Sequence, residues 1–323
     1  FAARGLAIKR GSDIDVSGIS SLSPVYMPGN KITLLPKSVV EQFSLDEGKY
    51  CPTLSFYLDF NEETLAIIQT ESRIESVLIK ANLRHDHLSD WVTAELLTQA
   101  PVADLIVPEA LKNVELKDLQ FLFRLAQKLK LDRELVRGKP EIQTRPDFDF
   151  KLQKPSADQP LGDEVVQITQ RKRGEPLDLI VAEAMILTNH HWGRLLADKG
   201  VPGIYRSQAA LAPGVKVRMS TKPLIHAGIG VDCYAWSSSP LRRYVDMVNQ
   251  WQLIALAKHG VTAKMVAPFQ PRDASLMGIA ADFETCYQSY NEYQDRMEKY
   301  WCLRWLTQEP LPRTVFARHL KEG

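Results

Sequence analysis

Cysteine is scarce in this sequence, and its four copies are not arranged as a zinc site or a disulfide scaffold. No C-x-x-C pair occurs in the 323 residues, and a small disulfide-stabilised secreted domain would need a denser set. We therefore expect free thiols in a reducing, cytoplasmic environment. The four positions are Cys51, Cys233, Cys286 and Cys302.

Long apolar runs, an excess of one charge and nucleotide-binding glycine motifs are absent as well. No run approaches the roughly 18 apolar residues of a membrane-spanning helix, so we expect no membrane segment. The 40 Lys and Arg residues balance 39 Asp and Glu, so an anionic partner must be held by a local basic cluster. Neither G-x-G-x-x-G nor G-x-x-x-x-G-K occurs, which argues against a phosphate-binding metabolic enzyme.

What the sequence does contain is enough apolar material for a large folded core. Apolar residues make up 45% of the chain and charged residues 24%, which is typical of a globular protein. The first residues, FAARGLAIKRGSD, include neither an initiator methionine nor the apolar core of a signal peptide. We expect the chain to be the interior of a longer protein.

Periodicity predicts an alternation of short strands and long helices. Pro176 stands near the start of one apolar-periodic segment and Gly200 just past its end, which favours a helix between them. Alternating runs bounded by turn residues predict strands. The expected strands cover 51–60, 72–80 and 226–236, and the expected helices cover 176–199, 240–258 and 273–307.

The stretch WSSSPLRRYVD places two arginines at the start of a predicted helix. Ser239 and Pro240 form a helix-start signal, with serine as the cap and proline at the first helical position. Arg242 and Arg243 then lie where the helix dipole favours anions, so a phosphate would compensate their charge. In the alternative interpretation, Arg242 pairs with Asp246 at i+4 and the other arginine is solvated.

Two further side chains are unusual in their context. Glu183 is a carboxylate in a nearly all-apolar helix, where such a charge needs a task or a partner. Its alternative is an internal ion pair with an arginine. Tyr26 stands beside a Pro-Gly turn, where its ring could stack on a base; its alternative is a tyrosine of the core.

Four segments together resemble the catalytic RNB domain of the ribonuclease II family. This resemblance implies an α/β domain with a central mixed sheet, surrounded by helices, and a channel for single-stranded RNA. It implies an RNB core over 1–311 and the start of a C-terminal OB-fold RNA-binding domain over 312–323. The matching segments are VYMPGNKITLLP (25–36), LIVAEAMILTN (179–189), GIYRSQ (203–208) and YAWSSSPLRRYVDMVNQWQL (234–253).

The same resemblance implies roles for individual residues. Arg242 is expected to contact the scissile phosphate, and Tyr26 to stack on the 3′-terminal base. Glu183 matches a catalytic-site glutamate near the terminal nucleotide. Further substrate-binding positions implied by the match are Arg206, Arg243 and Ser239.

The implied reaction is hydrolysis of RNA from its 3′ end to nucleoside 5′-monophosphates, with Mg²⁺ activating the attacking water. Two departures from the family pattern accompany it. The aspartate cluster that holds the metal is expected upstream of Phe1, so no metal ligand is assigned within the chain. The second aromatic of the base clamp aligns near Ile142. The rival hypothesis is a catalytically inactive RNA-binding module that uses the same channel.

Overall fold

A computed structural model describes residues 11–84, 88, 90–99, 108–141, 147–153, 164–171 and 174–308. The chain divides into two compact units. Unit 1 comprises Phe1–Pro24, Thr33–Ile142 and Arg173–Tyr287, and unit 2 comprises Val25–Ile32, Gln143–Lys172 and Gln288–Gly323. Ile142 and the expected domain boundary after residue 311 lie outside the described residues.

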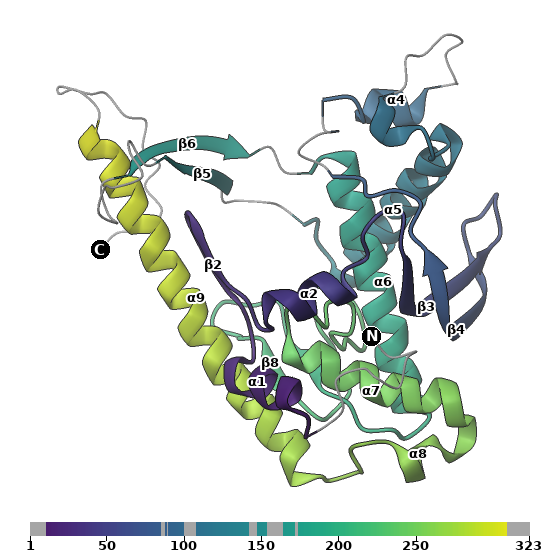
Figure 1. Cartoon of the computed structure of the whole chain (residues 1–323). Coiled ribbons are helices and arrows are strands. Elements are labelled where there is room, and N and C mark those ends of the chain that lie inside the picture. The colour runs from purple at the N-terminus through teal and green to yellow at the C-terminus, as the bar shows by residue number, and fades with distance from the viewer. Residues whose placement is uncertain are drawn as a thin grey trace. The chain divides into compact units, whose positions relative to one another are not determined.

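Helices account for most of the regular structure (Figure 1). Helix α6 begins at Pro176 and α9 covers almost the expected range, so both long-helix predictions are confirmed. Within the described residues, no helix is both long and apolar enough to cross a membrane. The helices are α1 (Asp13–Ser21), α2 (Lys37–Phe43), α4 (Ala94–Thr98), α5 (Leu116–Arg137), α6 (Pro176–Asp198), α7 (Tyr244–His259), α8 (Ala263–Val266) and α9 (Ala274–Gln308), with short 3₁₀ turns at Glu109–Leu111 and Gly260–Thr262.

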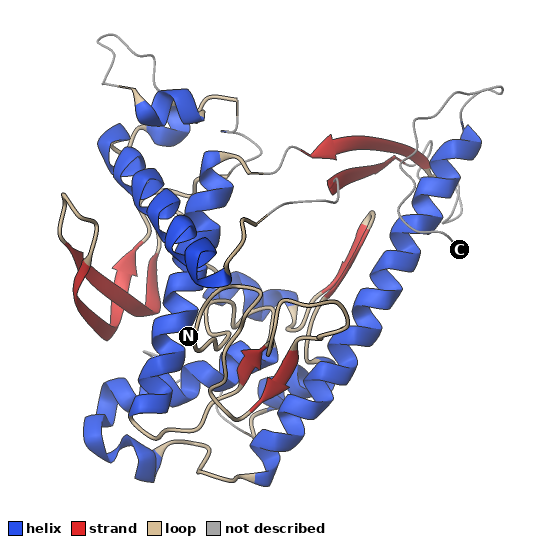
Figure 2. Cartoon of the chain, turned by 180° about the vertical axis from the view of Figure 1, so that it is seen from behind, coloured by secondary structure: helices blue, strands red, loops and turns tan. Residues whose placement is uncertain are grey.

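The described strands form separate antiparallel pairs, red in Figure 2. This differs from the expected central mixed sheet, because each described strand pairs with its neighbour in sequence and with no third strand. The strands at 51–60 and 72–80 were predicted and pair as β3 and β4. The pairs are β1 (Val25–Met27) with β2 (Asn30–Ile32), β3 (Tyr50–Phe60) with β4 (Ile67–Leu78), β5 (Asp147–Gln153) with β6 (Val165–Arg171), and β7 (Tyr205–Ser207) with β8 (Arg218–Ser220).

The segment before α7, predicted as the end of a strand, is a loop held by side chains. The Asn189 carboxamide of α6 accepts a hydrogen bond from the Ser237 N–H at 2.8 Å. From α7, Asn249 donates to the Trp236 carbonyl at 2.8 Å and Gln250 to the Ser237 carbonyl at 2.7 Å. The strand prediction over 226–236 is wrong because residues 227–230 form a turn, in which the Ile229 and Gly230 N–H groups both donate to the His226 carbonyl.

The core of unit 1 surrounds α7. The side chains of Tyr244, Val245 and Met247 are buried there, and they pack with apolar residues of α2 and of the first turns of α9. The Tyr244 hydroxyl donates a 2.5 Å hydrogen bond to Asp15, which links α7 to α1. Helices α5 and α6 pack side by side in the same unit (Figure 1). The loop that carries the predicted arginines is held against this core by hydrogen bonds to Asn189 of α6 and Gln250 of α7.

The four cysteines are all free, as the sequence predicted. Cys51 and Cys233 are buried, and burial raises the pKa of the Cys233 thiol to about 12. A thiol in that state is protonated at neutral pH and is a poor nucleophile. Cys233 therefore acts as a small apolar side chain of the core.

Candidate functional site

The two arginines lie in a turn that precedes α7 and not in the helix itself. The N–H groups of Arg242 and Arg243 both donate to the Ser239 carbonyl at 3.1 Å, and α7 begins at Tyr244. The prediction of Ser239 as the cap and Pro240 as the first helical residue is therefore wrong. The cause is that the Ser239 N–H donates to the Asp246 carboxylate at 2.8 Å, which draws residues 239–243 into a turn over the helix end.

Arg243 is neutralised inside the protein. Its Nε and Nη2 atoms donate to the two carboxylate oxygens of Asp246, at 2.7 and 2.8 Å, and both side chains are buried. Burial would lower the pKa of Arg243, but the adjacent Asp246 carboxylate outweighs it and raises the pKa. The sequence had offered Asp246 as a partner for Arg242 at i+4. The structure gives that partner to Arg243 at i+3.

Arg242 has the opposite surroundings. Its side chain is exposed, and no ion pair or hydrogen bond joins its guanidinium to any described residue. The turn fixes its backbone through the Ser239 carbonyl. An exposed guanidinium on an anchored backbone is suited to receive a phosphate, because its planar donors match two phosphate oxygens.

Arg206 of β7 joins Arg243 on one aromatic ring. The Cζ atoms of Arg206 and Arg243 lie 4.4 and 4.0 Å from the centroid of the Trp236 ring, within the range of cation–π contacts. Burial, and then the charge of Arg243, lower the pKa of Arg206. We call Arg206, Trp236, Arg243 and Asp246 the arginine–tryptophan cluster. Sequence reasoning missed Trp236, although it lies within the motif that carries the arginines, and it named Asp246 only as a partner for Arg242.

Glu183 forms the internal ion pair that the sequence offered as its alternative. Arg133 of α5 donates through Nε to one Glu183 oxygen at 2.9 Å and through Nη2 to the other. The same guanidinium donates to the Ile229 carbonyl at 2.6 Å and approaches Glu141 at 3.5 Å. Both carboxylate oxygens of Glu183 are thus engaged by protein. A role for Glu183 at the terminal nucleotide stays a prediction.

Tyr26 lies on the surface of unit 2. Its side chain is 45% exposed, so the alternative of a core tyrosine is wrong. Its N–H donates to Gln294 of α9 at 2.6 Å, and the Pro28-Gly29 turn follows. Gly29 has a φ of 73°, and a Cβ there would lie 2.4 Å from a Leu152 methyl carbon. The positive φ therefore favours glycine in the turn that follows Tyr26.

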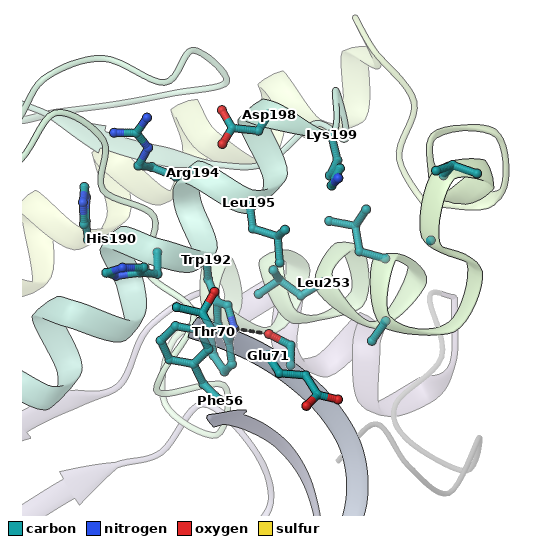
Figure 3. A pocket seen from close by; sticks show the side chains of 16 residues that line it. Phe56, Thr70, Glu71, His190, Trp192, Arg194, Leu195, Asp198, Lys199 and Leu253 are labelled. Carbon is teal, nitrogen blue, oxygen red and sulfur yellow. Dashed lines mark hydrogen bonds between the residues drawn. The ribbon is translucent and has the colours of Figure 1, made fainter. Parts of the chain in front are cut away.

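A cavity of about 710 Å³ in unit 1 has balanced charges (Figure 3). Its walls carry Arg194 and Lys199 but also Glu71 and Asp198, so it has no net attraction for an anion. Trp192 forms part of the wall and donates to the Ser72 hydroxyl at 3.0 Å. The predicted site residues do not line this cavity. The anion-binding chemistry of unit 1 is therefore better placed at the arginines.

The sequence from residue 6 to 259 matches a known family. Residues 6–214 and 213–259 align with the RNB domain. The chain belongs to the RNB domain family. Exoribonuclease 2 of Aeromonas hydrophila is 26% identical over 308 residues, which is 77% of this chain and 42% of that protein. The chain spans about half the length of the curated relatives it matches.

Solved structures of the family share the fold of this RNB domain. Mycoplasma genitalium RNase R, in complex with ribose-methylated single-stranded RNA, superimposes with a TM-score of 0.72 at 15% identity, over 93% of this chain and 52% of that one. Yeast Ssd1, described as a pseudonuclease, superimposes with a TM-score of 0.61 at 15% identity, over 90% and 38%. The expected RNB-type α/β fold is confirmed.

The described residues do not fit a magnesium centre. Among them, no group of three or more His, Cys, Asp or Glu side chains could hold a metal ion. The resemblance assigns the ligands of the RNB domain upstream of Phe1, and that assignment stays a prediction.

We expect Tyr26→Ala to weaken the binding of single-stranded RNA by about 1–3 kcal/mol, because it removes a surface on which a base can stack. Tyr26→Phe should keep most of the affinity, since it keeps the ring. A binding titration with poly(A) measures both. Tyr57→Ala is the matched control, because Tyr57 is an exposed tyrosine of unit 1 whose hydroxyl is bonded to Glu75. Equal losses in the Ala and Phe variants would contradict stacking.

Proposed function

We propose that this RNB domain is the core of an exoribonuclease that hydrolyses single-stranded RNA from the 3′ end to nucleoside 5′-monophosphates. The observation that carries the proposal is the state of Arg242. Within the segment that is most specific for the family, Arg243 has a carboxylate partner, whereas Arg242 is exposed and has none among the described residues. A free arginine at that position is suited to bind the scissile phosphate.

The proposed roles follow from the surroundings of each side chain. Arg242 contacts the scissile phosphate and stabilises the negative charge that develops on it as the bond breaks. Tyr26 stacks on the 3′-terminal base with its exposed ring. Unpaired bases and a flexible backbone make single-stranded RNA the suitable substrate, because an A-form duplex hides its bases from such a ring.

Magnesium and a cytoplasmic location complete the proposal. Aspartates expected upstream of Phe1 would hold Mg²⁺, and the bound metal would supply an activated water. The chain's own residues bind and orient the RNA. Four free cysteines are in keeping with a reducing compartment.

A second candidate is an inactive RNA-binding module with the same site. It is favoured by the likeness to yeast Ssd1, which is described as a pseudonuclease. In that case Arg242 and Tyr26 would hold RNA without cleaving it. Both the exoribonuclease and the inactive module must bind RNA, but only the exoribonuclease cleaves it.

The deciding experiment incubates the full-length protein with 5′-labelled poly(A) and Mg²⁺, and repeats it with EDTA. A ladder that shortens from the 3′ end only with metal is expected. With 3′-labelled poly(A), the label should leave as a nucleoside 5′-monophosphate in the first turnover. Tight binding of poly(A) without any shortening would instead support the inactive module.

A further inference from the structure

The Trp236 ring is held rigidly enough to position the guanidinium groups that pack on its face. Its side chain is buried, and it packs edge-on against Phe283 and Tyr287 of α9, with ring centroids 6.2 and 5.8 Å away. Its carbonyl accepts a hydrogen bond from Asn249 at 2.8 Å. A ring fixed on several sides offers a preformed surface for guanidinium groups, so less freedom is lost when one lies on it.

The two guanidiniums on this ring differ in their charge compensation. Arg243 donates twice to Asp246, so its charge and two of its donors are already used. Arg206 makes no ion pair with a described residue, and the groups acting on its pKa are Tyr287, Tyr234 and Arg243, none of them a carboxylate. A half-buried arginine stays charged at neutral pH and is costly to bury without a counter-ion.

The position of Arg206 is nevertheless fixed. Its N–H donates to the Tyr234 carbonyl at 2.8 Å, and its strand pairs with β8. His226, the neighbouring titratable group, has its pKa lowered to about 4 by burial and by Arg206, so it is neutral at physiological pH. The local charge left uncompensated is thus that of Arg206, and an anion would neutralise it.

We propose that Trp236 is a positioning residue that orients Arg206 to bind a backbone phosphate of RNA. Asp246 neutralises Arg243, so Arg243 does not bind a phosphate. This rests on the proposed function, because the anion is taken to be a phosphodiester of bound RNA. It adds a phosphate contact at Arg206, separate from the one at Arg242. In this proposal Arg243, which was predicted to bind substrate, instead stabilises the turn before α7.

The test measures how the affinity of the full-length protein for poly(A) depends on salt. Each phosphate contact on a single strand contributes about 0.7 to the slope of log affinity against log salt. Arg206→Gln should therefore reduce the magnitude of the slope by about 0.7. Arg218→Gln is the matched control and should keep the slope, because Arg218 is a surface arginine of unit 1 paired with Glu284 at 3.0 Å.

Arg243 is tested together with its partner, since removing it alone would leave Asp246 buried and unpaired. The double variant Arg243→Gln with Asp246→Asn removes both charges at similar size, and its salt slope should equal that of the wild type. A slope reduced as much as in Arg206→Gln would mean that Arg243 contacts phosphate, and would overturn the division of roles.

The ring is tested by a conservative and a disruptive variant. Trp236→Phe keeps an aromatic face and should keep the wild-type slope, whereas Trp236→Leu should lower it as Arg206→Gln does. In the Arg206→Gln background, Trp236→Leu should change the slope no further, since it acts through Arg206. A wild-type slope in Arg206→Gln would overturn this inference alone. Absence of salt-dependent poly(A) binding by the wild-type protein would overturn the proposed function and this inference with it.

Discussion

Glu183→Gln is expected to lower the free energy of unfolding by about 3–5 kcal/mol, because it removes the buried carboxylate that binds the Arg133 guanidinium and leaves only the half-exposed Glu141, 3.5 Å away. The side chains of Glu183 and Arg133 are both buried, and Arg133 is held in place by the Ile229 carbonyl at 2.6 Å. The guanidinium therefore cannot turn to water without giving up that bond. Urea unfolding of the full-length protein, followed by tryptophan fluorescence, measures the loss.

Two controls distinguish the cost of leaving a buried arginine without its buried partner from the cost of losing a carboxylate anywhere on the protein. Glu41→Gln removes an exposed glutamate paired with Lys37 at 3.5 Å, and it should cost less than about 1 kcal/mol. The double variant Arg133→Met with Glu183→Leu removes both charges, and it should be more stable than Glu183→Gln. A loss below about 1 kcal/mol in Glu183→Gln would contradict the importance of the pair.

The same variants decide whether Glu183 also acts on RNA. If Glu183 only joins α5 to α6, cleavage should recover in the double variant to the extent that stability recovers. If it contacts the terminal nucleotide, as the resemblance implies, cleavage should stay low in a double variant that is stably folded. Single-turnover cleavage of poly(A), beside the unfolding curves, gives the answer.

The long helices could be predicted because their signals are local. Helix α6 begins at Pro176 as expected, and α5 ends at Arg137, followed by Gly138, whose φ of 76° is natural for glycine just past a helix end. The start of α7 could not be predicted in this way. It depends on Asp246 binding the Ser239 N–H, a contact that local propensity does not reveal. The segment 226–236 is not a strand because residues 227–230 turn back on the His226 carbonyl.

The motif drew attention to the two arginines, but it did not reveal which of them pairs with Asp246. At i+3 and i+4, Arg243 and Arg242 are equally plausible partners of Asp246 on a helix. The turn places Arg243 next to the carboxylate and leaves Arg242 outside. Trp236 was missed because Arg206 belongs to β7, about thirty residues earlier, and no local spacing relates the two residues.

Arg242→Ala is expected to slow single-turnover cleavage by about 100- to 1000-fold, because it removes donors aimed at the charge that develops on the scissile phosphate. RNA affinity should mostly survive, since this interaction is stronger in the transition state than in the ground state. The fold should survive as well, because the Arg242 side chain is exposed and joins no ion pair with a described residue. Cleavage, poly(A) affinity and urea unfolding are measured on the same full-length variants.

Arg242→Lys tests whether charge alone suffices at this position. Lysine keeps the positive charge but loses the planar pair of donors, so it should recover only part of the activity lost in Arg242→Ala. Arg218→Ala removes an exposed arginine of the same unit and should leave cleavage unchanged, which controls for net charge.

Cleavage within about twofold of wild type in Arg242→Ala would place the phosphate site elsewhere, because the loss of an essential transition-state donor costs far more than that. Arg206 of β7 would then be the next arginine to test, since it lies on the Trp236 ring and makes no ion pair with a described residue.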